Sequence, residues 1–235
     1  MSDNNKTYEK YARLYPVIVA MLIPLILFII IGKELASLYL KLNDIWNILI
    51  SIIPASFITT ALGYGVKLVA RSTSKKLFQF PLFKEDETKM PTTDYLLWST
   101  KYASMQKKQL IREKIKQEIG LELLDEVQES QNENEARLLI VDAVSQIREK
   151  TRDNTILFNY LCSFGFIRNF LGANVWALLI TILYMSYNFV IPIVSNKIAV
   201  GSVIFVVLLF PLFYMFLRQT GREYARQLFT AFLEI

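Results

Sequence analysis

Residues 198–217 are IAVGSVIFVVLLFPLFYMFL and contain no charged side chain. A helix of this length would match the hydrocarbon core of a bilayer, which takes roughly 17–25 apolar residues to cross. Three further stretches are similar in length and also uncharged, at 15–32, 45–66 and 173–193. The sequence therefore predicts an all-α integral membrane protein with four transmembrane helices.

The order of these spans predicts how the chain is organised. Short connections at 33–44 and 194–197 join them in pairs, and the long connection 67–172 separates the pairs. We therefore expect two transmembrane hairpins with a helical insert between them. The expected segments are a leader at 1–14, a first hairpin at 15–66, the insert at 67–154, an interfacial helix at 155–172, a second hairpin at 173–217 and an amphipathic basic tail at 218–235.

The positions of lysine and arginine predict the orientation. Of the 26 basic residues, all but Lys33, Lys41 and Lys197 lie in the leader, the connection 67–172 or the tail. Cytoplasmic segments of membrane proteins carry this excess of positive charge. Both termini and the insert are therefore expected on the cytoplasmic side.

The composition argues against enzymatic chemistry. Histidine is absent and Cys162 is the only cysteine, which excludes intrachain disulfides, Cys/His zinc sites and histidine acid–base catalysis. The chain has no nucleotide-binding glycine loop and no G-x-S-x-G motif. The consecutive acids Glu85, Asp86 and Glu87 predict a solvated turn, not a metal site. We expect no enzyme activity, no cofactor and no bound metal.

The insert shows helical patterns. One helix is expected through residues 94–119, with Thr92 and Thr93 after Pro91 as N-cap candidates and Gly120 as the C-terminal glycine. Residues 135–150, EARLLIVDAVSQIREK, place an apolar stripe on a second helix: Ala136, Leu139, Ile140, Ala143, Val144 and Ile147. The nearest partners for this stripe are Ile111, Ile115 and Ile119. So small a hairpin buries little surface, so we expect other subunits or the membrane surface to complete its core.

The segment 155–171 is apolar but contains Arg168. This predicts an amphipathic helix at the inner membrane interface, with the following Gly172 as a hinge into the third span. The tail repeats the pattern, with three arginines along one face and Leu228, Phe229 and Phe232 on another.

The third span carries a line of polar residues at intervals of seven, which is nearly two helical turns: Asn174, Thr181, Asn188 and, just beyond the span, Ser195. The second span adds Ser51, Ser56, Thr59 and Thr60. Facing lipid, such groups would be costly, so they are expected to face protein or water. Two interpretations remain open, hydrogen bonding between helices or the wall of a pore formed by several copies. The pore-lining residues would be Asn174, Thr181, Asn188, Ser51 and Thr59.

No charged residue lies within the four spans. Ion-coupled transporters, proton pumps, voltage sensors and intramembrane aspartyl proteases usually need intramembrane charge, so these classes are disfavoured. A rather unselective pore lined by hydroxyls and amides remains compatible with the sequence.

The insert also interleaves basic and aromatic side chains. Lysines for phosphates and rings for bases are typical of a site for a nucleotide or a single strand of nucleic acid. The candidate ligand-binding residues are Lys84, Lys89, Trp98, Lys101, Tyr102, Lys108 and Arg112. Contacts with anionic lipid or internal packing are the alternatives.

Three blocks together resemble a group of multi-span bacterial membrane proteins from anti-phage operons that contain nucleotidyltransferase-like partners. They are FPLFKEDETKMPTTDYLLW at 80–98, EARLLIVDAVSQIREK at 135–150 and GFIRNFLGANVWA at 165–177. The membrane effectors of the Hailong defence system are the group they resemble most, over most of residues 76–180. The membrane subunit of the Kiwa system and transmembrane effectors gated by cyclic oligonucleotides are further similar groups.

We expect a homo-oligomer, for example a tetramer, in the bacterial inner membrane. The resemblance implies a partner enzyme whose single-stranded DNA oligomers hold a membrane channel shut. We therefore expect a pore-forming or ion-channel effector that is gated from the cytosol by a nucleotide or oligonucleotide and disrupts the membrane when it opens. The alternatives are a non-conducting membrane sensor or scaffold that recruits a cytosolic defence effector, and a protein whose helices 155–171 and 218–235 perturb lipid.

Overall fold

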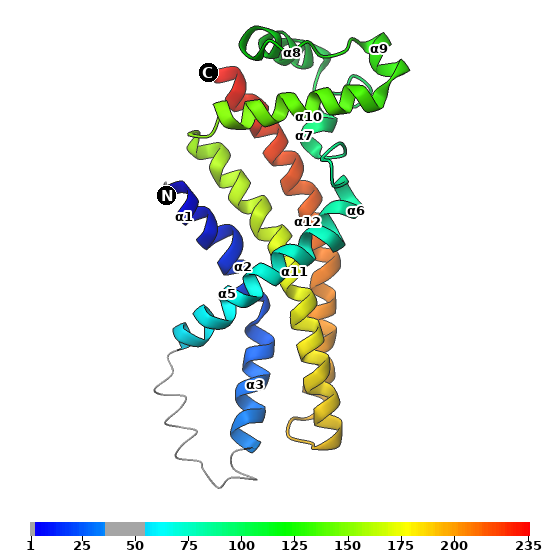
Figure 1. Ribbon diagram of the computed structural model, residues 1–235. Coiled ribbons are helices and arrows are strands. Elements are labelled where there is room, and N and C mark those ends of the chain that lie inside the picture. Colours follow the sequence, from blue (N-terminus) through cyan, green and yellow to red (C-terminus); the bar gives the residue numbers. More distant parts are fainter. Residues whose placement is uncertain (1–2, 36–54) are drawn as a thin grey trace. The chain divides into compact units, whose positions relative to one another are not determined.

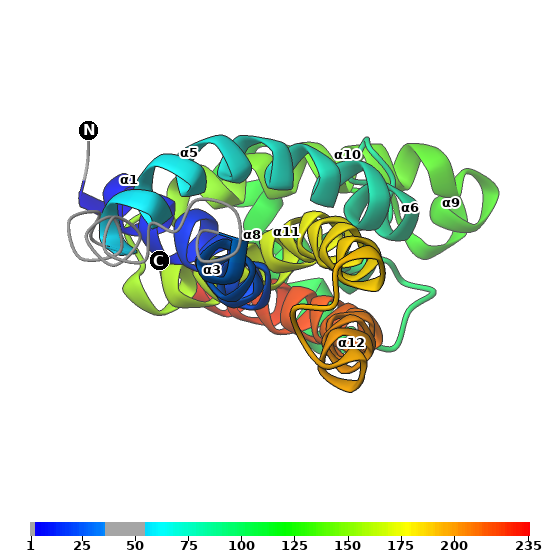
Figure 2. The ribbon, with the colours of Figure 1, turned by 90° about the horizontal axis from the view of Figure 1, so that it is seen from below.

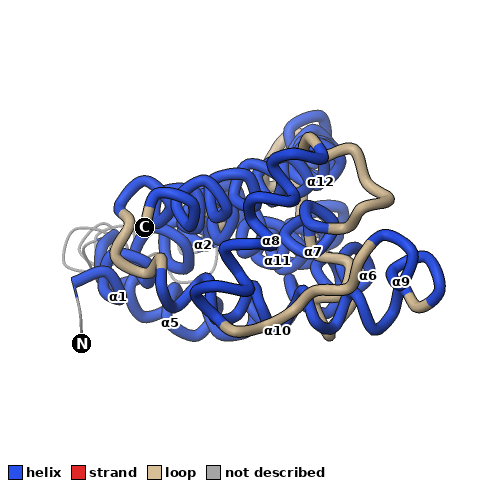
Figure 3. Tube along the Cα trace, turned by 90° about the horizontal axis from the view of Figure 1, so that it is seen from above, coloured by secondary structure: helices blue, strands red, loops and turns tan. Residues whose placement is uncertain are grey.

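The computed structural model describes the backbone of residues 3–35 and 55–235, and the side chains of residues 4–31 and 65–235. The described residues form helices joined by loops, and no strand occurs among them (Figures 1 and 3). This confirms the predicted all-α class. The chain divides into two compact units, which we call unit 1 (residues 1–78 and 165–215) and unit 2 (79–164 and 216–235).

Unit 1 begins with a series of short helices. They are α1 (Asp3–Tyr8), the π-helical η1 (Glu9–Leu14), α2 (Tyr15–Ala20) and α3 (Leu22–Leu35). Pro16 lies in the first turn of α2, where its missing N–H costs nothing. The axes of residues 4–20 and 22–31 differ by 41°. We attribute this bend to Pro24, which cannot donate to the carbonyl of Ala20.

Helices α5 (Ala55–Ser74) and η3 (Lys75–Gln79) follow, and unit 1 also takes the apolar parts of α11 (Thr155–Val190) and α12 (Asn196–Glu234). Figures 1 and 2 show α11 and α12 as the two longest helices. The core of this unit is small and combines α2, α5 and α11 through Val17, Ala20, Ala70, Phe170 and Ala173.

Helices α11 and α12 are each long and apolar enough to cross a membrane, and the bent series from α1 to α3 would add a third span. The structure therefore supports a membrane protein, while four spans in two hairpins remain a prediction. Residues 45–54 of the second predicted span lie outside the described residues.

Unit 2 is a bundle of short helices that is closed by the ends of the two long ones. Its own helices are α6 (Phe80–Phe83), α7 (Pro91–Leu96), α8 (Met105–Ile119), α9 (Glu126–Gln131) and α10 (Glu133–Lys150). As predicted, the apolar stripe of α10 and residues Ile111 and Ile115 of α8 belong to one core, with Ile119 packed against it. Leu139 is the one residue of the predicted stripe that is not part of this core. The chain's own C-terminus contributes to this core as well, where other subunits or the membrane surface were expected. Its contribution is Tyr224, Ala225, Leu228, Phe229, Ala231 and Phe232.

Two predictions about local structure are wrong. The single helix expected at 94–119 is two helices, because α7 ends at Leu96 and α8 starts after Ser104, whose side chain accepts a hydrogen bond from the Lys107 N–H. The N-cap of α7 is Met90, so Thr92 and Thr93 lie inside the first turn. Gly120 ends α8 as predicted, with φ +74°.

The predicted boundary at Gly172 is also wrong. Helix α11 continues from Thr155 to Val190 without interruption, so residues 155–171 are not a separate interfacial helix and Gly172 is not an elbow. Gly172 instead allows close packing, because a Cβ atom there would clash with the Ala70 carbonyl oxygen and with Ser74 of α5. The tail is likewise the end of α12, not a separate element.

Candidate functional site

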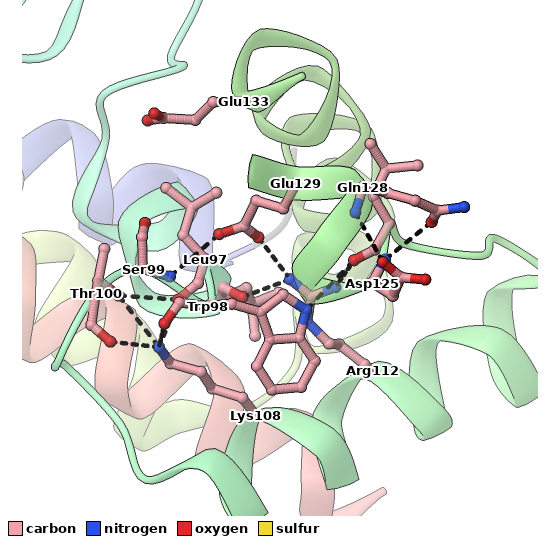
Figure 4. A network of polar contacts seen from close by, with 12 residues as sticks. Leu97, Trp98, Ser99, Thr100, Lys108, Arg112, Asp125, Gln128, Glu129 and Glu133 are labelled. Carbon is pink, nitrogen blue, oxygen red and sulfur yellow. Dashed lines mark hydrogen bonds and ion pairs between the residues drawn. The ribbon is translucent and has the colours of Figure 1, made fainter. Parts of the chain in front are cut away.

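Two of the predicted ligand-binding cations are buried inside unit 2. Lys108 on α8 is fully buried, and its ammonium group donates hydrogen bonds to the backbone carbonyls of Leu97 and Thr100 (Figure 4). It also lies 3.4 Å from the Trp98 carbonyl oxygen. These carbonyls follow the end of α7 and have no helical partner, so Lys108 stabilises the turn that joins α7 to α8.

Arg112, one helical turn after Lys108, joins three segments. Its Nη1 donates to the Leu124 carbonyl at 2.6 Å, and its Nη2 donates to the Leu96 carbonyl at 2.7 Å. Nη2 also pairs with the carboxylate of Glu129 at 3.2 Å, and that ion pair is buried on both sides (Figure 4). The second oxygen of Glu129 accepts the Ser99 N–H at 3.1 Å. The guanidinium group of Arg112 therefore bonds to groups inside unit 2.

Burial changes the acid–base properties of these cations. It lowers the pKa of Lys108 from its usual 10.5, with Arg112 acting in the same direction and Glu129 opposing it. It lowers the pKa of Arg112 as well, again against the effect of Glu129. Glu129 therefore offsets part of the cost of placing two cations out of water.

Capping fixes the position of Glu129. Asp125 forms a capping box with Gln128 at the start of α9, which orients the short helix (Figure 4). Helix α9 then presents Glu129 to Arg112. The sequence analysis did not identify Glu129 as functional, because an isolated glutamate in a polar link gives no pattern that distinguishes it from a solvated one.

Lys84 and Lys89 are exposed and line a polar groove of about 440 Å³. The remaining lining residues come from the joint between α9 and α10: Gln131, Asn132, Glu133, Asn134 and Arg137. Arg137 is fixed there by Asp94 at 2.8 Å and by Glu133 at 2.8 Å. Two exposed lysines beside amide groups are suited to bind an anion, so this groove is the part of the predicted ligand set that remains accessible.

Lys101 and Tyr102 lie elsewhere in unit 2, and both are exposed. The Tyr102 ring lies 5.3 Å from the guanidinium carbon of Arg222, at a second groove of about 210 Å³. The predicted ligand-binding residues therefore do not form one site. They separate into the buried group around Lys108 and Arg112, the Lys84–Lys89 groove and the surroundings of Tyr102.

The segment 84–94 is held by two arginines of α10. Arg137 donates to the Thr88 carbonyl at 2.7 Å, and Arg148 pairs with Glu87 at 2.8 Å. Asp86 accepts hydrogen bonds from the side chain and backbone of Thr88, at 2.7 and 3.2 Å. The turn at 85–87 is predicted to contact only solvent, but α10 also holds it, through Arg137 and Arg148. Arg137 and Arg148 are eleven residues apart, which is three helical turns, so they lie on the same face of α10. This spacing is the sequence signal that could have indicated that both contact the same segment.

The polar line of the third span faces the interior of unit 1. Asn174, Thr181 and Asn188 are all buried. Asn174 donates to the Val206 carbonyl of α12 at 3.0 Å, and Thr181 donates to the Ala177 carbonyl at 2.7 Å. Asn174 thus forms a hydrogen bond between helices, as in the alternative interpretation, whereas Thr181 bonds within α11. Ser51 lies outside the described residues, as does the side chain of Thr59.

Asn188 organises the turn between α11 and α12. Its side-chain oxygen accepts the N–H groups of Ile193 and Val194, at 3.1 and 2.7 Å. Its amide nitrogen donates to the Val194 carbonyl at 2.8 Å and to Asn196 at 3.1 Å. A single side chain thus satisfies several backbone groups of a turn that an apolar residue would leave without partners.

Within the described residues, no group of three acidic or cysteine side chains is placed to hold a metal ion. Comparisons with protein-family models, with curated proteins and with solved structures gave no match.

Proposed function

We propose that this chain is a membrane effector in which a helical cytosolic module, unit 2, controls helices that cross the membrane. The observation that carries the proposal is the continuity of α11, which contains no proline and contributes Leu157 to the core of unit 2 and Phe170 to the core of unit 1. Sharp bends in helices occur at specific features such as a proline or a π-bulge. A helix without such a feature moves as one rod, so a displacement of one end is transmitted to the other.

The activity we propose is conduction by a pore formed by several copies, which would disrupt the membrane of an infected bacterium. The proposal rests on the apolar helices, on the absence of charge from their predicted spans and on the resemblance to anti-phage effectors. A pore lined by α11 requires its buried amides to become exposed on opening. In a single chain Asn174 and Asn188 form hydrogen bonds within the protein.

Conductance of the purified full-length protein in planar bilayers tests this activity. Ser163→Pro would interrupt α11 at an exposed position beside Phe164, the last residue of α11 in unit 2, whereas Ser163→Ala keeps the helix. We expect the alanine variant to conduct like the wild type and the proline variant to lose regulated opening. Unchanged regulation in Ser163→Pro would contradict transmission through α11.

The double change Asn174→Leu and Asn188→Leu tests the pore wall. We expect it to abolish toxicity and dye entry, while Ser186→Ala at an exposed position of the same helix has no effect. Folding of the double variant is checked by its melting temperature in detergent. Retained dye entry in a folded double variant would exclude α11 as the wall.

We propose that the controlling ligand is a nucleotide or single-stranded oligonucleotide whose phosphates bind in the Lys84–Lys89 groove. Binding of a fluorescent single-stranded DNA oligomer is compared between the wild type, Lys84→Gln with Lys89→Gln, and a control with Lys101→Gln and Lys116→Gln. We expect the groove variant to lose roughly tenfold or more in affinity at low salt, and the control to lose far less. Equal losses would indicate attraction by general positive charge.

A second function is a non-conducting sensor or scaffold that recruits a cytosolic effector. The burial of the α11 polar line favours it, because Thr181, Asn188 and the amide nitrogen of Asn174 already have hydrogen-bond partners within the chain. The side-chain oxygen of Asn174 is the one atom among them that is buried without a partner. A scaffold would remain silent in planar bilayers with and without its partner.

A further inference from the structure

Three helical elements of unit 1 meet at one junction, formed by η1, α5 and α11. The Lys67 ammonium of α5 donates to Glu9 of η1 at 2.9 Å. The Asn169 side chain of α11 donates to the Ala12 carbonyl of η1 at 2.6 Å. Gly172 of α11 lies directly against the backbone of α5. Each pair of elements is therefore in contact, and the contacts on each helix lie within about two turns.

Each element brings a guanidinium group to this junction. They come from Arg13 of η1, Arg71 of α5 and Arg168 of α11, and Lys67 adds a fourth cation. Arg71 and Arg168 lie near enough to Arg13 for their charges to act on it. The Arg168 side chain is only 9% exposed, so this charge lies deep in the junction.

Few acids balance these cations. The stretches 4–20, 65–78 and 165–176 contain eight lysines and arginines and a single acid, Glu9. Arg13 and Lys67 both pair with that one carboxylate. Like charges at short range repel, so an external anion would be attracted to the excess of positive charge that these three stretches carry.

The neighbouring aromatic residues are typical of the headgroup region of a membrane. Tyr8, Tyr11 and Tyr15 follow one another along the N-terminal helices. Trp176 of α11 donates its indole N–H to Thr73 of α5 at 3.0 Å. Tyrosine and tryptophan concentrate where one end of a side chain is apolar and the other is wet, and basic pockets between helices at that depth suit phosphate headgroups.

We infer that the η1–α5–α11 junction binds the phosphate of an anionic phospholipid of the cytoplasmic leaflet. Arg13 and Arg71 donate to the phosphate oxygens, because guanidinium groups bind phosphate in a two-pronged geometry. Arg168 supplies positive potential from its buried position. The bound lipid would hold the three elements together, and this role does not depend on conduction or on an oligonucleotide.

The test uses the full-length protein in detergent and measures bound lipid by native mass spectrometry. Phosphatidylglycerol and phosphatidylcholine are offered separately to the wild type, to Arg13→Gln with Arg71→Gln, and to a matched control. The control is Arg222→Gln with Arg226→Gln, which removes two exposed arginines from unit 2. We expect selective binding of phosphatidylglycerol that falls roughly tenfold or more in the junction variant and stays near the wild-type level in the control.

Three outcomes would overturn the inference. Equal binding of the two lipids would remove the need for an anionic headgroup, and equal loss in the control would indicate general charge attraction. If inorganic phosphate stabilises the lipid-free protein as strongly as phosphatidylglycerol does, the site recognises a soluble phosphate and not a lipid. Should the double variant fail to fold, Arg71→Gln alone is compared with Arg71→Lys, and unchanged phosphatidylglycerol binding by the glutamine variant would equally contradict the site.

Discussion

The guanidinium group of Arg112 lies over the indole ring of Trp98, with 4.4 Å between its central carbon and the ring centroid. Both side chains also donate to the Leu124 carbonyl, at 2.6 and 3.3 Å. Two residues that the sequence suggested for binding a base and a phosphate therefore bind each other. They stabilise the joint between α7, α8 and the segment before α9.

Arg112→Met should destabilise unit 2 by about 3–5 kcal/mol, because Glu129 would remain buried without its partner. The measurement is equilibrium denaturation of the full-length protein in detergent. Adding Glu129→Leu to Arg112→Met should recover part of the loss, because both charges are then absent.

The exposed pair Lys116–Glu122, 2.7 Å apart, provides the control for this experiment. Lys116→Met should change the free energy of unfolding by less than about 1 kcal/mol, because exposed ion pairs contribute little. A similar loss in both variants would mean that the burial of Glu129 has no energetic consequence.

Lys108→Met keeps the volume of the buried side chain but removes its hydrogen bonds to the carbonyls of Leu97 and Thr100. We expect a loss of about 2–4 kcal/mol, because both carbonyls would lose the buried ammonium group and the Leu97 carbonyl would keep only its bonds from Thr100. Faster hydrogen exchange in residues 97–104 would locate the effect. Lys101→Met, at an exposed position, should stay within about 0.5 kcal/mol of the wild type.

Gly172→Ala should destabilise unit 1 by about 1–3 kcal/mol, because the added methyl group would push α11 away from Ala70 and Ser74. Gly201→Ala is the matched control, since nothing lies within 4 Å of a Cβ at that position of α12. The control should be neutral or slightly stabilising through its higher helix propensity. Melting temperatures in detergent distinguish the two.

Hydrogen bonds from the side chain and backbone of Thr88 lower the pKa of Asp86 below its usual value of 3.8. A carboxyl group whose pKa is lowered in the folded state stabilises that state above the unfolded pKa, and the stabilisation is lost as the pH falls through the folded pKa. The melting temperature of Asp86→Asn should therefore lie below that of the wild type at neutral pH. This difference should shrink below pH 3.8, and a difference that is constant with pH would contradict the assignment.

Local sequence patterns sufficed for several features of this protein. The stretches 173–193 and 198–217 are apolar and long enough for a helix to cross a bilayer, whose thickness sets the length required. The structure confirms long apolar helices there. The 3.6-residue period identified the buried face of α10, and Gly120 marked the end of α8, since few other residues adopt its positive φ readily.

The role of each polar residue depended on contacts between segments distant in sequence. Nothing in the local pattern around Lys108 or Arg112 indicates that α7 ends at Leu96 and turns its free carbonyls toward them. Nothing around Gly172 indicates that α5 packs against it. The sequence thus determined which segments are helical and apolar. Tertiary packing decided which cations are buried and which remain available for a ligand, because burial is a property of the neighbours that long-range folding brings together.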